Sequence, residues 1–261
     1  MNLDLTGKTA IVCGSTQGLG YASAVELALM GCTVVLMARN EEKLQEVVKT
    51  LSTTKQQQHS WLVADFKNVA AVKKAIDGYL QNNTAQILVN NTGGPAGGTA
   101  LNATAEEFLS AFNSHLINNH QLMQALVPGM KAAGFGRIIN IISTSVKIPI
   151  AGLGVSNTIR GAVANWAKTL ATELGPFGIT VNNVLPGFTK TSRADYVISN
   201  KAKKEGISEE AVMVQLQAEI PAGRIGEPEE FGAAVAFLCS PAAAYINGIN
   251  LPVDGGRLGC L

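Results

Sequence analysis

Short, continuously apolar runs rich in β-branched residues alternate with helical patterns along most of this chain. An apolar run without polar alternation is typical of a strand that is covered on both faces, as in a parallel sheet. Parallel neighbours need right-handed helical crossovers, so the pattern predicts a single Rossmann-like, doubly wound α/β domain of about seven strands, with helices on both faces. The predicted strands begin at Thr9, Thr33, Ser60, Gln86, Arg137, Ile179 and Ile249.

The helical patterns carry boundary signals of their own. Thr104 and Glu107 have the spacing of a capping box, which predicts a helix that continues toward Ala133. Pro228 suits the first position of a helix that ends near Cys239. Further helices are expected over residues 22–30, 41–51, 69–80 and 154–175, and another is expected to begin at Ser208.

One segment interrupts the alternation of strands and helices. About forty residues separate the sixth predicted strand from the helix that follows Pro228, which is longer than an ordinary connection. Long insertions at the carboxyl ends of strands commonly form the substrate side of a site. We therefore expect one dinucleotide-binding domain over residues 1–261, with a substrate-side insertion at about 188–226.

The composition of the chain limits the kinds of binding partner that are expected. The 261 residues are 47% apolar and 15% charged with a net charge of +1, so nothing favours nucleic acid or an anionic membrane as the main partner. The chain has no apolar run of about 18 residues and does not begin with a signal-peptide pattern. Its four cysteines lack metal-ligand spacing, which predicts free thiols and no metal site. We expect a cytoplasmic protein with a small-molecule substrate.

The first predicted strand runs directly into a glycine-rich turn and then a helix. Its glycines follow the spacing G-x-x-x-G-x-G, at the first connection of a βαβ unit. Glycines let the backbone approach a pyrophosphate, and a helix N-terminus favours the negative charge of that group. The turn predicts a dinucleotide site formed by Gly14, Ser15, Thr16, Gln17, Gly18, Leu19 and Gly20.

The end of the second predicted strand indicates which dinucleotide. An acidic residue there would bind a ribose 2′-hydroxyl and repel a 2′-phosphate. This chain has Arg39 at that place and no carboxylate before Glu41. A guanidinium pairs well with a phosphate, so we predict NADP(H) in preference to NAD(H). The alternative for Arg39 is a surface charge that precedes a helix.

The order of these motifs resembles the short-chain dehydrogenase/reductase family over nearly the whole chain. The family's TGxxxGxG appears as CGSTQGLG, its NNAG as NNTGG and its PGxxxT as PGFTKT, and the chain resembles the 3-oxoacyl-[acyl-carrier-protein] reductase-like members. The resemblance implies that Asp65 contacts the adenine ring, Asn90 lines the cofactor cleft and Thr191 holds the nicotinamide amide. It also places Phe66, Asn91, Gly93, Pro186, Gly187 and Thr189 among the coenzyme contacts.

The resemblance fails at the proton-transfer residues. The family uses a serine, a tyrosine and a lysine four residues later, usually helped by an asparagine. The matching positions here are Ser143, Ser156, Arg160 and His115. A serine hydroxyl is a far weaker acid than a phenol, and an arginine stays charged. His115 is therefore the candidate proton donor, because its unperturbed pKa suits exchange at neutral pH; the alternative is a histidine packed on an apolar helix.

Two functions remain open from the sequence. The first is an NADP(H)-dependent oxidoreductase that acts on a ketone or 3-oxoacyl-type carbonyl, or on the matching alcohol. In it, Ser143 polarises the oxygen, Arg160 holds the ribose, and Ser156 or a water passes on a proton from His115 or solvent. The second is a nicotinamide-nucleotide-binding sensor or assembly protein without hydride chemistry. The resemblance and the small residues over 162–167 also imply a homo-oligomer, a tetramer or a dimer.

Overall fold

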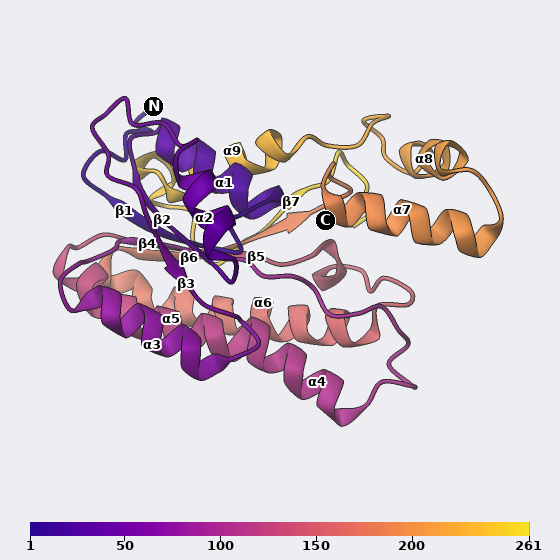
Figure 1. The fold of residues 1–261 in the computed structure, drawn as a ribbon, viewed down its shortest axis with the longest axis horizontal. Coiled ribbons are helices and arrows are strands. Elements are labelled where there is room, and N and C mark those ends of the chain that lie inside the picture. The colour runs from indigo at the N-terminus through magenta and orange to yellow at the C-terminus, as the bar shows by residue number, and fades with distance from the viewer. Residues whose placement is uncertain (261) are drawn as a thin grey trace.

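The structure, a computed structural model, describes residues 1–260 and is built around one parallel sheet. The strands are β1 (Thr9–Cys13), β2 (Thr33–Ala38), β3 (Ser60–Val63), β4 (Ile87–Asn90), β5 (Gly136–Ile141), β6 (Ile179–Pro186) and β7 (Asn250–Val253). Their order across the sheet is β3-β2-β1-β4-β5-β6-β7, which confirms the predicted doubly wound fold (Figure 1). The strand order reverses between β1 and β4, and sheets of this kind bind ligands at the carboxyl edge beside that point.

Helices cover both faces of the sheet (Figure 1). On one face lie α1 (Gly18–Leu29), α2 (Glu41–Val48) and α9 (Pro228–Cys239). On the other face lie α3 (Val69–Leu80), α5 (Asn118–Ala132) and α6 (Gly154–Leu174). Each layer buries its own apolar core against the sheet.

The continuous hydrophobicity of the strands follows from these two cores. In β1, Ala10 and Val12 belong to the core under α1 and α9. Ile11 and Cys13 belong to the core under α3, α5 and α6. All four side chains are fully buried. A strand that faces two cores favours apolar residues at successive positions, which is why the apolar runs did not alternate.

The long helix predicted from Thr104 contains an irregular turn. The capping box is present, with Thr104 Oγ1 accepting from Glu107 N–H at 3.2 Å and the Glu107 carboxylate accepting from Thr104 N–H at 2.9 Å. α4 (Ala105–Phe112) then passes through a five-residue π-helical turn, η1 (Asn113–Ile117), before α5. His115 lies in this turn, and π-turns within helices occur frequently at functional sites.

The segment between β6 and α9 forms two helices beyond the carboxyl edge of the sheet (Figure 1). These are α7 (Ser192–Glu205) and α8 (Glu209–Ala218), which pack on each other through a small apolar cluster. α8 begins after Ser208, as predicted. The bounds of α7 were not predicted from the sequence, because this helix buries only Ala194, Ile198 and Ala202 among many polar residues.

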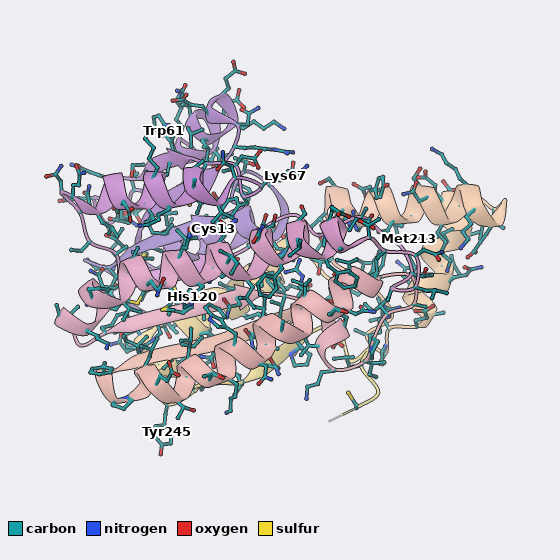
Figure 2. All side chains as sticks on the ribbon, turned by 90° about the horizontal axis from the view of Figure 1, so that it is seen from below. Cys13, Trp61, Lys67, His120, Met213 and Tyr245 are labelled. Carbon is teal, nitrogen blue, oxygen red and sulfur yellow. The ribbon has the colours of Figure 1, made fainter. Side chains whose placement is uncertain are left out.

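The four cysteines of the chain form no disulfide within residues 1–260. Cys13, Cys32 and Cys239 are free and buried, and Cys260 is free and exposed. Figure 2 shows Cys13 inside the molecule and Tyr245 projecting from its surface. Over residues 1–260, no helix combines the length and the apolar character needed to cross a membrane.

Candidate functional site

The glycine turn after β1 is closely packed. Gly14 and Gly18 both have φ of +57°, a conformation that glycine adopts far more easily than other residues. At Gly20 the constraint is space instead. A Cβ at Gly20 would lie 2.3 Å from the Gly14 carbonyl oxygen and 2.7 Å from Asn91 Nδ2. Any side chain at Gly20 would therefore displace the turn.

Asn91 holds the turn from the end of β4. Its Nδ2 donates hydrogen bonds to the carbonyl oxygens of Cys13, at 3.3 Å, and Gly14, at 3.1 Å. Ser15 lies beneath the turn, fully buried, and its hydroxyl accepts a hydrogen bond from Met37 N–H at 3.1 Å. The Ser15 side chain thus joins the turn to β2.

Asn90 departs from the expectation that it lines the cofactor cleft. It is 2% exposed, and its Nδ2 donates to Asn140 Oδ1 at 2.9 Å. The same contact repeats from Asn140 to Asn183 at 2.9 Å and from Asn183 to Asn250 at 2.8 Å. These residues are in register, so the four amides form a ladder across β4, β5, β6 and β7. Asn90 therefore ties the sheet together, and it is Asn91 that meets the turn.

The ends of β2 and β3 carry the residues expected near the adenosine half of a coenzyme. Arg39 is exposed directly after β2, and Asp65 is exposed after β3, the strand that pairs with β2. Asp65 Oδ1 accepts a hydrogen bond from Lys67 N–H at 3.0 Å. Phe66 is buried, and its carbonyl accepts from Asn118 Nδ2 at 2.6 Å. Arg39 and Asp65 are therefore free to meet a ligand at the carboxyl edge, whereas the Phe66 side chain packs inside.

The segment after β6 returns to the glycine turn. Thr191 caps α7 by accepting a hydrogen bond from Ala194 N–H at 3.4 Å. A Cβ at Gly18 would lie 3.5 Å from Thr191 Cγ2, so the two segments are in contact. Gln17 Nε2 also donates to Ser192 Oγ at 3.4 Å. The fold thus brings the glycine turn and the start of α7 together across a long separation in sequence.

The other residues of the PGFTKT segment are held by the backbone. Gly187 N–H donates to the Val253 carbonyl at 2.9 Å, and a Cβ at Gly187 would lie 2.5 Å from Asp254 Cα. Thr189 is buried and bridges to Gly226. The segment from Pro186 to Thr191 therefore follows a path determined by close backbone contacts.

Ser143 stands at the carboxyl end of β5, where it begins the short helix η2 (Thr144–Val146). Its Oγ accepts a hydrogen bond from Ser145 N–H at 3.1 Å, and the residue is half-buried. Ser156 is also half-buried, in the first turn of α6, and η2 packs against α6. Both predicted hydroxyls thus lie in neighbouring elements at the carboxyl edge.

The loop before α6 is fastened by residues that the sequence analysis missed. Gly98 N–H donates to the Gly152 carbonyl at 2.8 Å, and Gly154 N–H donates to the Gly98 carbonyl at 2.9 Å. Asn157 Nδ2 donates to the Ile150 carbonyl at 2.9 Å. These bonds join the loop after β4 to the loop that leads to Ser156. In the sequence, Asn157 was the only residue that could have indicated these hydrogen bonds.

Arg160 is a buried cation. It is 8% exposed, and Nη1 donates to the Ile141 carbonyl at 3.0 Å. Its Nε–H is buried without a partner among the described residues, and Nη2 lies 3.8 Å from the place of a Cβ on Gly94. Burial lowers the pKa of the guanidinium to about 10, so it keeps its charge at neutral pH. No ion pair within residues 1–260 includes it.

His115 lies beside Arg160 but does not have the properties expected of an acid. The ring is 3% exposed and hydrogen-bonded to the backbone of Gly93. Burial, together with the nearby charge of Arg160, lowers the pKa of the imidazole to about 2. The ring is therefore neutral at physiological pH. This burial favours the alternative stated from the sequence, a histidine packed on an apolar helix, over the role of proton donor.

We expect His115 to make the fold less stable as the pH falls below about 6.5. In the unfolded chain the ring binds a proton near its ordinary pKa of 6.5, whereas the folded ring, with a pKa of about 2, does not. The unfolded state then binds more protons, and this group lowers the free energy of unfolding by at most about 1.4 kcal/mol per pH unit. Urea unfolding between about pH 7 and 5 should give a shallower decline for His115→Gln than for the wild type. Equal slopes would contradict the buried neutral ring.

Comparisons with known proteins agree in family and in coenzyme. The family described as Enoyl-(Acyl carrier protein) reductase matches residues 14–257. The NADPH-dependent reductase BacG of Bacillus subtilis is 31% identical, over 97% of this chain and 99% of that protein. The 3-oxoacyl-[acyl-carrier-protein] reductase FabG of Pseudomonas aeruginosa is 31% identical, over 97% and 98%. L-sorbose reductase from Gluconobacter frateurii, solved with NADPH and L-sorbose, superposes with a TM-score of 0.94 at 30% identity over all of both chains.

Proposed function

Because this chain belongs to the short-chain dehydrogenase/reductase family, we propose that it reduces a ketone or 3-oxoacyl-type carbonyl with hydride supplied by bound NADPH. The chain is an oxidoreductase of this family that acts at carbonyl or hydroxyl groups and uses NADP(H). The observation that carries the proposed reaction is the position of Arg160, a buried cation without a counter-ion within residues 1–260. It lies at the carboxyl end of β5, which also bears Ser143.

The described residues fit NADP(H). The bare backbone at Gly14, Gly18 and Gly20 leaves a turn that a pyrophosphate can approach, at the N-terminus of α1. Arg39 is exposed where a 2′-phosphate would lie. Arg160 Nη1 donates to the Ile141 carbonyl, and the guanidinium has further N–H donors, from which a ribose hydroxyl would accept. Asp65 is exposed after β3 and Thr191 is half-buried at the start of α7, and we assign them to the adenine and the nicotinamide amide.

Ser143 and Arg160 can act on the substrate oxygen in different ways. The Ser143 oxygen accepts from Ser145 N–H, which orients the hydroxyl and leaves its hydrogen to donate to the carbonyl oxygen. Arg160 stabilises negative charge near that oxygen because its guanidinium is charged and shielded from water. Neither Arg160 nor the neutral His115 releases a proton at neutral pH. The proton therefore comes from solvent through Ser156.

The role of Arg39 can be tested by its removal. We expect Arg39→Ala to weaken NADPH binding by about 10- to 100-fold, the size of a lost charge-assisted contact, and to leave NADH binding nearly unchanged. Calorimetric titration with each coenzyme measures both affinities. Lys73→Ala removes an exposed cation from α3 and serves as the control. Equal losses for NADPH and NADH would contradict a contact with the 2′-phosphate.

The pH dependence of the rate distinguishes the proton sources. The pKa of His115 is about 2 and that of Arg160 about 10, so neither group changes charge between about pH 6.5 and 8.5. We expect kcat to be nearly constant across this range. A family tyrosine lowered by a lysine would instead give a sigmoidal profile. A sharp transition in single-turnover rates near neutral pH would contradict the solvent route.

The activity is tested by single-turnover oxidation of NADPH against a panel of ketones and 3-oxoacyl thioesters. Turnover with at least one carbonyl substrate is expected. Tight NADPH binding without oxidation over hours would instead favour a coenzyme-binding sensor or assembly protein. Absence of NADPH binding would contradict both functions.

We also propose that the chain forms a homo-oligomer, a dimer or a tetramer, through the helices that carry His115 and Trp166. Trp166 Nε1 donates to His120 Nδ1 at 3.4 Å, so α5 and α6 are already joined into one surface. Light scattering on purified protein measures the assembly, and a monomer at micromolar concentration would contradict it.

A further inference from the structure

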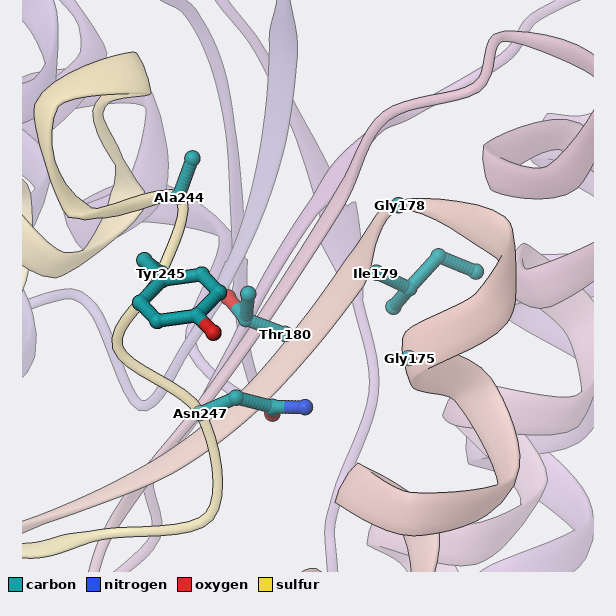
Figure 3. A pocket seen from close by; sticks show the side chains of 7 residues that line it. All are labelled: Gly175, Gly178, Ile179, Thr180, Ala244, Tyr245 and Asn247. Carbon is teal, nitrogen blue, oxygen red and sulfur yellow. The ribbon is translucent and has the colours of Figure 1, made fainter.

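Two arginines are buried among the described residues, at opposite edges of the sheet. Arg137 lies near the amino end of β5 and donates to the carbonyls of Gly136 at 2.8 Å, Gly178 at 3.3 Å and Ser240 at 3.5 Å. Gly178 also lines the hollow that Figure 3 shows at the amino end of β6, where no lining residue is charged. The backbone therefore holds Arg137, and this hollow offers no charged side chain to a ligand.

Arg160, near the carboxyl end of β5, has a single hydrogen-bond acceptor. Nη1 donates to the Ile141 carbonyl at 3.0 Å, and no hydrogen bond within residues 1–260 occupies Nη2. Nη2 lies 3.8 Å from the place of a Cβ on Gly94, in the loop that follows β4. Arg160 is 8% exposed and belongs to no ion pair in the described part of the chain. A buried cation with an unoccupied donor favours a negatively charged oxygen at this position.

Ser143 follows the same strand end and can donate to such an oxygen. Its Oγ accepts from Ser145 N–H at 3.1 Å, so the hydroxyl hydrogen is left to donate, and the residue is half-buried. The Ile141 carbonyl that holds Arg160 lies two residues earlier in the chain. The two groups thus provide a hydroxyl donor and a fixed positive charge at one edge of the sheet. This combination stabilises a reacting oxygen as it becomes negative.

Neither ionisable group buried at this site can neutralise that oxygen. The pKa of Arg160 is about 10 and that of His115 about 2, so neither releases a proton at neutral pH. Ser143 and Ser156 offer hydroxyls, and a serine hydroxyl is a far weaker acid than a phenol. Hydride addition to an isolated carbonyl produces an alkoxide, a strong base that needs an acid beside it as it forms.

Hydride addition to an α,β-unsaturated carbonyl compound needs no such acid. Addition at the β-carbon produces an enolate, whose negative charge is shared between the oxygen and the α-carbon. An enolate is a weaker base than an alkoxide, and a cation and a hydroxyl can hold it without protonating it. The residues present therefore fit an enolate better than an alkoxide.

We propose that Ser143 and Arg160 hold the oxygen of an enolate, and that this chain reduces α,β-unsaturated carbonyl compounds at their carbon–carbon double bond. The proposal rests on the coenzyme-dependent reduction proposed above and assigns a further hydride acceptor, the β-carbon. As hydride bonds to the β-carbon, the electron pair of the double bond moves between the α-carbon and the carbonyl carbon, and the carbonyl pair moves onto the oxygen. Solvent then protonates the α-carbon, so NADPH and one proton give NADP⁺ and the saturated carbonyl compound.

The anion site is tested without turnover, on protein saturated with NADP⁺. The probe is para-nitrophenol, whose phenolate shares its charge with the ring as an enolate shares its charge with carbon, and absorbance detects the phenolate. We expect the phenolate to bind about tenfold more tightly than the neutral phenol. Arg160→Gln should abolish this preference. Ser143→Ala leaves the buried cation in place and should weaken phenolate binding by about tenfold. The matched controls Ser145→Ala and Lys73→Ala should bind it as the wild type does.

The acceptor carbon is identified with NADPH that carries deuterium at the transferred position. An enone and the matching saturated ketone are supplied separately, and NMR locates the deuterium in each product. With the enone we expect a saturated ketone that carries the deuterium at its β-carbon. The same reaction in heavy water with unlabelled NADPH should place solvent deuterium at the α-carbon.

The outcomes separate this inference from the proposed carbonyl reduction. Deuterium on the carbinol carbon of an allylic alcohol, or equal binding of phenol and phenolate, would overturn the enolate site and leave carbonyl reduction standing. Reduction of the double bond without reduction of any saturated ketone would support the enolate site and contradict carbonyl reduction. Absence of NADPH oxidation with every enone and ketone would overturn both reactions.

Discussion

Replacing Gly20 by alanine is expected to weaken NADPH binding by about 100-fold, the size of a lost hydrogen bond to the charged pyrophosphate. The added Cβ would lie 2.3 Å from the Gly14 carbonyl oxygen and 2.7 Å from Asn91 Nδ2, and neither is the end of a flexible chain. The turn must therefore move, and its backbone N–H groups lose their position at the N-terminus of α1. Calorimetric titration with NADPH measures the loss.

Gly78→Ala is the control for this substitution, because nothing lies within 4 Å of a Cβ at that helical position. It should bind NADPH normally, with a slightly higher melting temperature. Asn91→Ala removes the amide that holds the glycine turn and adds no atoms. It should weaken NADPH binding by about tenfold, through the loss of the two hydrogen bonds to the Cys13 and Gly14 carbonyls. Wild-type affinity in Gly20→Ala would show that the turn does not seat the coenzyme.

Replacing Ser143 by alanine is expected to lower kcat by about 100- to 1,000-fold, the effect of removing one donor to a developing oxyanion. The effect is large because Arg160 supplies charge but no mobile proton at neutral pH, and the neutral His115 does not carry one. NADPH affinity should change little, because Ser143 begins η2 and takes no part in the glycine turn. Single-turnover kinetics with a reactive ketone, together with NADPH titration, separate the two quantities.

Ser145→Ala is the matched control, since it makes the same change two residues away, on a buried hydroxyl without a partner in the described part of the chain. It should keep most of the activity. Ser143→Thr retains a hydroxyl and should recover part of the rate. If Ser143→Ala and Ser145→Ala lost activity equally, the effect would belong to the packing of η2 and not to a donor at the substrate oxygen.

Much of the architecture could be predicted because each strand is buried on two faces. All seven strands begin within one residue of the predicted position, and the helix boundaries at Thr104 and Pro228 follow local capping chemistry. α7 escaped prediction because its contacts are small and mostly made with α8. The π-turn η1 has no pattern of its own in the sequence, so only the structure decided between the two alternatives for His115, a proton donor or a packed side chain.

The motif NNTGG does not predict the different contacts of its adjacent residues Asn90 and Asn91. Successive side chains at the end of a strand point in different directions, so one amide enters the ladder across the sheet and the other reaches the glycine turn. The motif NNTGG places both near the coenzyme and cannot distinguish them. Only the register of β4 against β5 assigns the ladder to Asn90.

The sequence by itself determined the doubly wound sheet, the coenzyme turn and the residue types available for chemistry, because periodicity and glycine spacing are local properties of the chain. The tertiary structure alone decided which of those groups can exchange a proton. A pKa depends on how much water and charge surround a group, and these come from segments far apart in the chain: burial between helices and the charge of Arg160 make His115 neutral.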